Sequence, residues 1–172
     1  DGSDTWSLCF DRTVLGDVAD YLIFMAYDQY GASSEQAGTT AGYNWIELNL
    51  KKFLETYEVE SEKLILAVPF YARLWTIDSS GNADGRTAIP MNEIEETIPS
   101  DVERKWDDEL KQNYVEYTED GETKKMWIED IDSLKEKISL IKEYDLGGIA
   151  AWELGMESDG VWQMINQELS GQ

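Results

Sequence analysis

Aromatic and charged side chains stand together at the ends of three apolar runs in this sequence of 172 residues. They are Tyr27 and Asp28 at the end of the first run, Tyr71 and Arg73 at and just past the end of the second, and Trp152 and Glu153 at the end of the third. Flat phenol and indole rings match the C–H face of a pyranose, and carboxylates and a guanidinium bond its equatorial hydroxyl groups. If the runs are neighbouring parallel strands, their carboxyl ends meet at one rim. The residue types therefore favour a sugar-binding site.

Each of these residues also has a structural explanation. An aromatic residue that ends a strand is commonly part of the core, and an aspartate after a strand commonly caps the next turn. Arg73 could pair with a nearby acid for structure alone. The coincidence at three separate strand ends is what favours binding.

The elements that would position these side chains alternate along the chain. Apolar runs over residues 21–27, 63–71 and 148–152 are typical of strands buried on both faces. Helical periodicity follows over 45–57, over 133–144 with Asp132 or Ser133 as the cap, and over 158–169. This alternation predicts a parallel sheet with right-handed crossovers, and three β/α units are too few to close an eight-stranded barrel.

A stretch of another kind lies between the second and third units. It holds a short predicted helix over 90–98 and a predicted hairpin, in which residues 114–117 and 125–128 alternate around a turn at 119–122. From Thr76 to Asp130 there are 16 acidic and 6 basic residues, a net charge of −10, which we interpret as a solvated face rather than a metal cluster. The sequence thus predicts barrel portions over 1–75 and 131–172 and an α+β insertion over 76–130.

Composition excludes several classes of function. The formal charge is −22, and a chain this acidic repels nucleic acid and anionic membrane surfaces. The absence of histidine removes Ser-His-Asp and Cys-His nucleophile systems and the commonest zinc sites, and we expect no metal or cofactor. No apolar run is long enough to span a bilayer, and no signal peptide opens the sequence. The single cysteine, Cys9, is predicted to be a small buried apolar residue.

Three segments resemble the last three β/α units of glycoside hydrolase family 18, in the bacterial cell-wall and spore-associated branch of its chitinase-like enzymes. The segments read FMAYDQYG, KLILAVPFYARLW and GGIAAWELGMESDGVWQMI. Their matching positions are Met25, Tyr27 and Asp28 in the first, Pro69, Tyr71, Arg73 and Trp75 in the second, and Trp152 in the third. The stretch between them resembles the family's small insertion domain at Trp106, Asp107, Tyr114, Tyr117, Trp127 and Asp130.

The resemblance implies a retaining hydrolysis assisted by the substrate, an exception to the scheme with two carboxylates. The acetamide oxygen of an N-acetylglucosamine unit attacks its own anomeric carbon while a glutamic acid protonates the leaving oxygen. Tyr27 would hold the acetamide oxygen, Asp28 would bond a hydroxyl and influence the pKa of the acid, and Trp152 would lie under the sugar. The further substrate-binding residues would be Met25, Gln29, Tyr71, Arg73 and Glu153.

The general acid of that family lies in a D-x-x-D-x-D-x-E motif, which this sequence does not contain. Asp1–Asp4 and Asp17–Asp20 match its first step and fail the second. Glu153 is no substitute, because as the residue after Trp152 it should alternate away from it. We therefore expect the C-terminal part of a (β/α)8 barrel enzyme, inactive by itself, and the opening DGSDTWS looks like a loop cut within a longer protein.

The expected partner is a glycan that contains N-acetylglucosamine, either chitin or peptidoglycan, with an extracellular, cell-wall or spore location implied by the resemblance. Two alternatives stay open. The chain could belong to a barrel that only binds glycan, or to a self-associating interaction domain. Self-association is expected in any case if three β/α units are exposed to water without the rest of the barrel.

Overall fold

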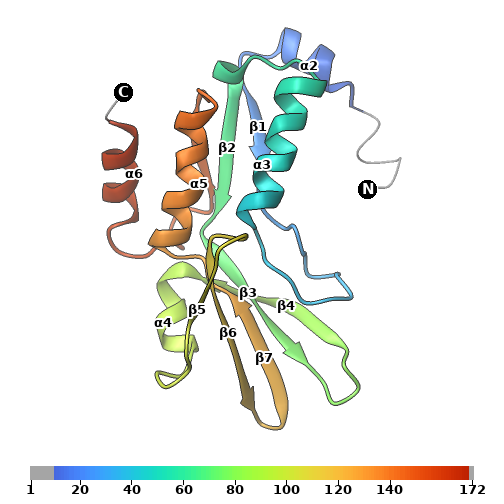
Figure 1. Ribbon diagram of the computed structural model, residues 1–172, viewed down its shortest axis with the longest axis vertical. Helices are drawn as coiled ribbons and strands as arrows, with labels where there is room; N and C mark the ends of the chain where they lie inside the picture. The colour runs from blue at the N-terminus through green and yellow to red at the C-terminus, as the bar shows by residue number, and fades with distance from the viewer. Residues whose placement is uncertain (1–9, 171–172) are drawn as a thin grey trace.

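A computed structural model describes residues 10–170 (Figure 1). Cys9 lies outside these residues. In the described part of the chain, the strands form a parallel sheet in the order β1-β2-β8 and an antiparallel sheet in the order β4-β3-β7-β6-β5. The two sheets lie end to end, and the chain passes from one to the other between β2 and β3 (Figure 1).

The parallel sheet carries the three apolar runs as strands. They are β1 (Leu22–Met25), β2 (Leu64–Pro69) and β8 (Gly148–Trp152). Both pairings are parallel, with Leu22 opposite Leu64 and Pro69 opposite Trp152. The prediction of a parallel sheet is therefore confirmed, and the carboxyl ends of the strands lie at the edge that faces the second sheet (Figure 1).

Helices cover one face of this sheet and enclose the main apolar core (Figure 1). They are α3 (Tyr43–Lys51) with a π-helical extension (Lys52–Thr56), α5 (Ile131–Glu143) and α6 (Val161–Leu169); a short α2 (Arg12–Val18) precedes β1, and a 3-10 turn (Ser61–Lys63) precedes β2. The inward stripes of α3 and α5 include Ile46, Leu50, Leu134 and Ile138, none of which is accessible to solvent. These are the apolar positions that the helical periodicity predicts.

The other face of β1 is open, which corrects the prediction that its residues are buried on both faces. Tyr21, Ile23 and Met25 are 61 to 66% exposed, whereas Phe24 between them is 9% exposed. Within the described residues β1 pairs only with β2. Because successive side chains of a strand point to opposite faces, the covered face takes Phe24 and the uncovered face takes its neighbours.

The N-cap of α5 is also corrected. Asp130 caps the helix, rather than Asp132 or Ser133, and its Oδ1 accepts a hydrogen bond of 2.8 Å from the backbone N–H of Ser133. The hydroxyl of Ser133 accepts the N–H of Asp130 in return, at 3.0 Å. This reciprocal capping box starts the helix two residues earlier than the periodicity indicates.

The second sheet begins directly after the first. Its strands are β3 (Tyr71–Ile77), β4 (Ala83–Pro90), β5 (Lys105–Asp107), β6 (Gln112–Glu119) and β7 (Glu122–Trp127), with a 3-10 turn (Met91–Glu93) and α4 (Ile94–Thr97) after β4. The predicted second strand therefore does not run through to Tyr71: β2 ends at Pro69, and Tyr71 opens β3. The domain boundaries at 75/76 and 130/131 stay a prediction.

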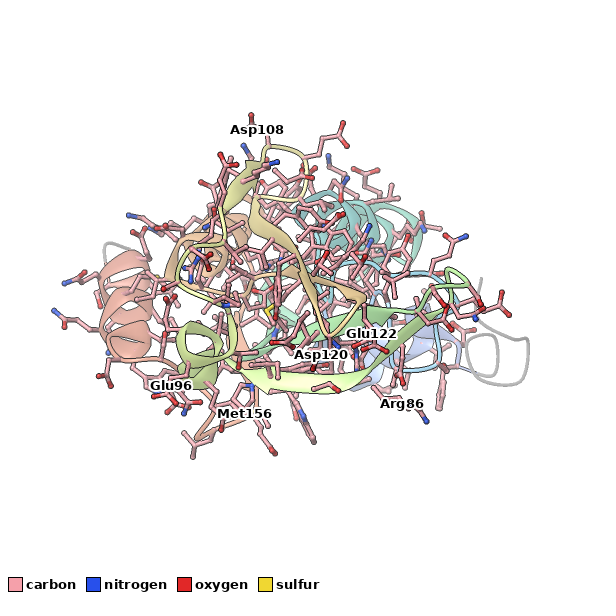
Figure 2. All side chains as sticks on the ribbon, turned by 90° about the horizontal axis from the view of Figure 1, so that it is seen from below. Arg86, Glu96, Asp108, Asp120, Glu122 and Met156 are labelled. Atoms are coloured by element: carbon pink, nitrogen blue, oxygen red, sulfur yellow. The ribbon has the colours of Figure 1, made fainter. Side chains whose placement is uncertain are left out.

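The predicted hairpin and the solvated acidic surface are both present. In the β6–β7 pairing, Tyr114 lies opposite Trp127 and Glu119 opposite Glu122, so Asp120 and Gly121 make the turn. Figure 2 shows Asp108 and Glu96 at the periphery of the molecule, with their side chains directed outward. Both residues are exposed, as most acids of this stretch are. A buried exception, Glu129, lies between β7 and α5.

Candidate functional site

The carboxyl end of β1 delivers Tyr27 and Asp28 to the junction of the two sheets. The N–H of Ala26 donates to the carbonyl of Ala67 at 2.8 Å, which continues the parallel ladder beyond the last residue of β1. Asp28 then adopts a left-handed backbone conformation with φ of 54°. Aspartate tolerates this conformation better than most residues, and the chain turns sharply there into the loop over 29–42.

Asp28 is bonded by two side chains of β3. Its Oδ1 accepts the phenol O–H of Tyr71 at 2.8 Å and an Nη2–H of Arg73 at 2.7 Å. The side chains of Tyr71 and Arg73 point to the same face of β3, since the two residues are two positions apart. The carboxylate itself is about half exposed, and its Oδ2 accepts no hydrogen bond from residues 10–170, so this oxygen is available to a ligand hydroxyl.

The guanidinium of Arg73 is held on both sides. Besides the bond to Asp28, its Nη1 donates to the carbonyl of Gly85 on β4 at 3.0 Å. Its Cζ lies 5.7 Å from the centroid of the Tyr71 ring. Arg73 is 9% exposed, and among the described residues its Nε has no hydrogen-bond partner. A buried cation held this firmly fixes the position of the carboxylate that it contacts.

Two aromatic rings lie beside this cluster. The ring centroids of Tyr27 and Trp152 are 6.5 Å apart, with an angle of 35° between the ring planes. Trp152 is the last residue of β8, its side chain is 53% exposed, and its peptide bond to Glu153 is cis. An indole that presents half of its surface to solvent at the end of a strand can stack on an apolar ligand face.

Both phenols of the cluster remain protonated donors at neutral pH. Burial, and next the charge of Asp28, raise the pKa of Tyr27 above its usual value. Burial, followed by the hydrogen bond that Tyr71 donates to Asp28, raises the pKa of Tyr71 further. The cluster therefore offers a phenol donor at Tyr27, a carboxylate acceptor at Asp28 and a stacking surface at Trp152. These groups can orient a polar sugar substituent.

The remaining predicted residues occupy different positions. Gln29 turns its Oε1 to the backbone N–H of Gly42 at 2.9 Å, so it closes the loop over 29–42. Met25 lies on the open face of β1 and is 62% exposed. Glu153 is exposed, and its carbonyl accepts the N–H of Met156 at 3.2 Å. The structure thus brings together Tyr27, Asp28, Tyr71, Arg73 and Trp152. The side chains of Met25, Gln29 and Glu153 form no hydrogen bond or ring contact with this cluster in the described part of the chain.

A second group of polar residues at the sheet junction was missed by the sequence interpretation. We call it the buried network: Thr39, Gln112, Glu129 and Lys137, each at most 2% exposed. The ammonium of Lys137 lies 2.6 Å from both carboxylate oxygens of Glu129. Burial raises the pKa of Glu129 to about 7 and lowers that of Lys137, and the ion pair opposes both shifts.

Trp75 connects β3 to the loop over 29–42. It is fully buried on β3, and its indole Nε1 donates to the carbonyl of Gly38 at 2.8 Å. Gly85 lies against its ring, because a Cβ at that position would approach the indole to 2.3 Å. The loop over 29–42 is therefore attached to β3 as well as to the buried network.

Over residues 10–170, no three acidic, cysteine or histidine side chains cluster closely enough to hold a metal ion. Among the described helices, none combines the length and the apolar character that crossing a membrane requires.

Comparison with known proteins gives consistent matches along the chain. The chain is 26% identical over 171 residues to the uncharacterized glycosylase YvbX of Bacillus subtilis (strain 168), which covers 97% of this chain and 47% of YvbX. It is 25% identical to the cortical fragment-lytic enzyme of the same organism, over 96% of this chain and 38% of that enzyme. A chitinase from Chromobacterium violaceum ATCC 12472 superposes with a TM-score of 0.83 and 28% identity, over 95% of this chain and 50% of that chain.

The chain thus spans about half the length, or less, of the relatives that it matches. Residues 2–157 match the model of the family described as "Glycosyl hydrolases family 18". This match covers more than half of the sequence and includes every residue of the cluster around Asp28. The chain belongs to family 18 of the glycosyl hydrolases.

Proposed function

We propose that the protein containing this chain is a retaining glycoside hydrolase, which cleaves a polymer of N-acetylglucosamine with the help of the substrate's own acetamide group. The observation that carries the proposal is the cluster at the sheet junction. Asp28 is fixed by Tyr71 and Arg73 at 2.8 and 2.7 Å, and Tyr27 and Trp152 lie beside it. Family membership supports the same class of reaction.

In the proposed reaction, the acetamide oxygen attacks the anomeric carbon as the glycosidic C–O bond breaks, and a general acid gives its proton to the leaving oxygen. Water then opens the oxazolinium intermediate and returns a proton to that acid. The Tyr27 phenol would donate to the acetamide oxygen and hold it in line with the anomeric carbon for the attack. Trp152 would stack under the distorted sugar, and the Oδ2 of Asp28 would accept a hydrogen bond from a hydroxyl group of the substrate.

The general acid would come from a part of the barrel outside these residues. Within residues 10–170 the acids beside Tyr27 and Trp152 are Asp28, which is paired with Arg73, and the exposed Glu153. We further propose that β1, β2 and β8 form part of a (β/α)8 barrel, in which the open face of β1 lies toward the interior. On this proposal the 172-residue chain by itself does not turn over substrate.

For the substrate we propose peptidoglycan or chitin, at a cell wall or spore outside the cytoplasm. The relatives support each polymer in turn: one is named a cortical fragment-lytic enzyme, and a solved structure is named a chitinase. Hydrolysis of chitooligosaccharides and of spore-cortex fragments, measured side by side on the complete protein, decides between them.

Two substitutions in the complete protein test the proposed site. We expect Trp152→Ala to lower kcat/KM by about 30- to 1000-fold, because stacking under the sugar accounts for roughly 2–4 kcal/mol of transition-state binding. Tyr27→Phe should reduce kcat more than it raises KM, since its hydroxyl acts on the nucleophile. Tyr21→Phe, at the opposite end of β1, and Trp162→Ala, on α6, are the matched controls.

The outcomes separate the proposal from its rivals. A Trp152→Ala protein that keeps more than about a third of the parental kcat/KM would remove Trp152 from the site. A protein that binds oligosaccharide through Trp152 without cleaving it would be a glycan-binding barrel. A rise in KM alone for Tyr27→Phe would limit this residue to binding.

We also propose that two copies of the isolated chain associate through the open face of β1. The exposed residues there, Tyr21, Ile23 and Met25, are apolar, and the edge of β1 carries no partner strand within the described residues. Unpaired edges and apolar patches of this kind are unfavourable in water.

A further inference from the structure

The buried network runs from α5 to the loop that follows Asp28. Lys137, on α5, pairs with Glu129, whose Oε1 also accepts an Nε2–H of Gln112 at 2.5 Å. Gln112 opens β6, and its amide oxygen accepts the hydroxyl proton of Thr39. Four side chains without solvent contact therefore connect α5, the end of β7, β6 and the loop over 29–42.

Thr39 in turn holds the residues next to Asp28. The carbonyl of Thr39 accepts the N–H of Tyr30 at 3.2 Å, and the carbonyl of Thr40 accepts the N–H of Gln29 at 2.9 Å. The Thr39 hydroxyl also accepts the N–H of Ala41 at 3.1 Å. Gln29 and Tyr30, directly after the sharp turn at Asp28, are thereby hydrogen-bonded to the buried segment Thr39–Thr40 at the other end of the loop.

The polarity of the network fixes its orientation. A carboxylate only accepts, so Gln112 must turn its NH2 group toward Glu129 and its carbonyl toward Thr39. Because the Oε1 of Gln112 is an acceptor, the side chain at position 39 must supply a donor, which is the hydroxyl of Thr39. The Lys137 ammonium, 2.6 Å from both carboxylate oxygens, favours the charged form of Glu129 and so opposes the burial that raises its pKa. In this dry environment each bond of the network is stronger than in water.

We propose that Glu129 and Lys137 are positioning residues, which act through Gln112 and Thr39 to hold the segment Asp28–Tyr30 in its catalytic position. The inference rests on the proposed function for its catalytic consequence. It adds that the site depends on an ion pair at the far side of the sheet junction, which touches no substrate.

Position 39 allows a sharp test, because its two parts can be removed separately. Thr39→Val keeps the shape and loses the hydroxyl, whereas Thr39→Ser keeps the hydroxyl and loses the methyl group. Thr40→Val is the matched control: Thr40 is equally buried, and in the described residues its Oγ1 has no hydrogen-bond partner. Gln112→Met interrupts the network at the next residue with little change in volume.

Hydrogen exchange of the backbone amides of Gln29 and Tyr30, followed by NMR or mass spectrometry on the complete protein, is the first measurement. We expect Thr39→Val and Gln112→Met to accelerate this exchange by about ten-fold or more. In Thr39→Val the buried amide oxygen of Gln112 loses its donor, and in Gln112→Met the buried hydroxyl of Thr39 loses its acceptor, so the loop opens more often. Thr39→Ser and Thr40→Val should exchange as the parent does.

Kinetics on chitooligosaccharides is the second measurement. Thr39→Val should lower kcat by about ten-fold while KM changes by less than about two-fold, since misplacement acts on the transition state more than on ground-state binding. Thr39→Ser should restore the parental kcat. A general loss of packing would instead affect Ser more than Val.

The inference is overturned if Thr39→Val leaves the exchange unchanged, if Thr40→Val accelerates it equally, or if exchange rises while kcat stays at the parental value. Circular dichroism of each variant identifies any that does not fold, and the Val/Ser pair still decides if Gln112→Met is lost in this way. A parent protein that hydrolyses no glycan would contradict the proposed function alone, because the exchange result stands independently of turnover.

Discussion

Replacing Lys137 by methionine should destabilise the protein more than any exposed lysine substitution. Methionine fills nearly the same space, so the perturbation is the removal of one charge at a site with 0% side-chain exposure on both partners. The carboxylate of Glu129 would keep only Gln112 and Ser133 as donors. Removing one partner of a buried ion pair costs about 3–5 kcal/mol.

Urea denaturation followed by tryptophan fluorescence measures this loss. With a slope of about 2 kcal/mol per molar urea, a loss of that size lowers the midpoint by roughly 2 M. Lys51→Met is the control, because its partner Glu47 lies on the surface of α3 and the pair is 42% and 28% exposed. We expect the midpoint of this control to stay close to that of the parent protein.

The double substitution Glu129→Leu with Lys137→Met removes both charges and should recover most of the lost stability, since apolar residues of similar volume often replace a buried pair without loss. The reasoning is refuted if the single substitution lowers the midpoint by less than about 0.5 M, or if the double variant is less stable than the single one. Either result would mean that water, a rearranged side chain or protonation of Glu129, whose pKa burial already raises, compensates the lost ammonium.

Three further predictions concern other parts of the molecule. Burial raises the folded-state pKa of Tyr71 above its usual value of 10.0, so the stabilising contribution of this phenol is full below pH 10 and is lost as the pH rises further. Tyr71→Phe should therefore flatten the decline of stability at alkaline pH. It should also remove a late step from the titration of tyrosinate absorbance. Gly85→Ala should lower both the melting temperature and kcat, because a Cβ there would lie 2.3 Å from the Trp75 ring; unchanged values of both would contradict this contact. Light scattering coupled to size exclusion should show the isolated 172-residue chain as a dimer, and a monomer of 19.7 kDa that melts cooperatively would exclude the proposed association.

The fold was largely predictable where local pattern decides it. The apolar runs that end at Tyr27 and Trp152 do form strands of a parallel sheet, although one face of β1 is open, and the turn at Gly121 fixes the hairpin. The end of β2 was not predictable in this way. Hydrophobicity continues from Leu64 through Tyr71, and nothing in that pattern shows that the chain changes sheets at Phe70.

The candidate site was predictable only in part, for a physical reason. Residues at strand ends are brought together by the parallel sheet, so Asp28, Tyr71 and Arg73 could be grouped before the contacts between them were seen. The buried network depends on a pairing across 73 residues, from Thr39 to Gln112, which no local pattern contains. One signal was present: Lys137 falls on the inward stripe of α5, three residues after Leu134, and a lysine there requires a buried acid.

The passage from β2 to β3 leaves no hinge between the two sheets. A single residue, Phe70, separates the strands; it is fully buried, its N–H donates to the carbonyl of Trp152 at 2.7 Å, and its carbonyl accepts the N–H of Met91 at 3.0 Å. Hinge closure needs a few residues whose backbone dihedrals can change freely, and Phe70 cannot rotate without breaking both bonds. The two sheets should therefore move as one rigid body, which keeps Trp152 at the end of β8 in a fixed position relative to Tyr71 and Arg73 on β3.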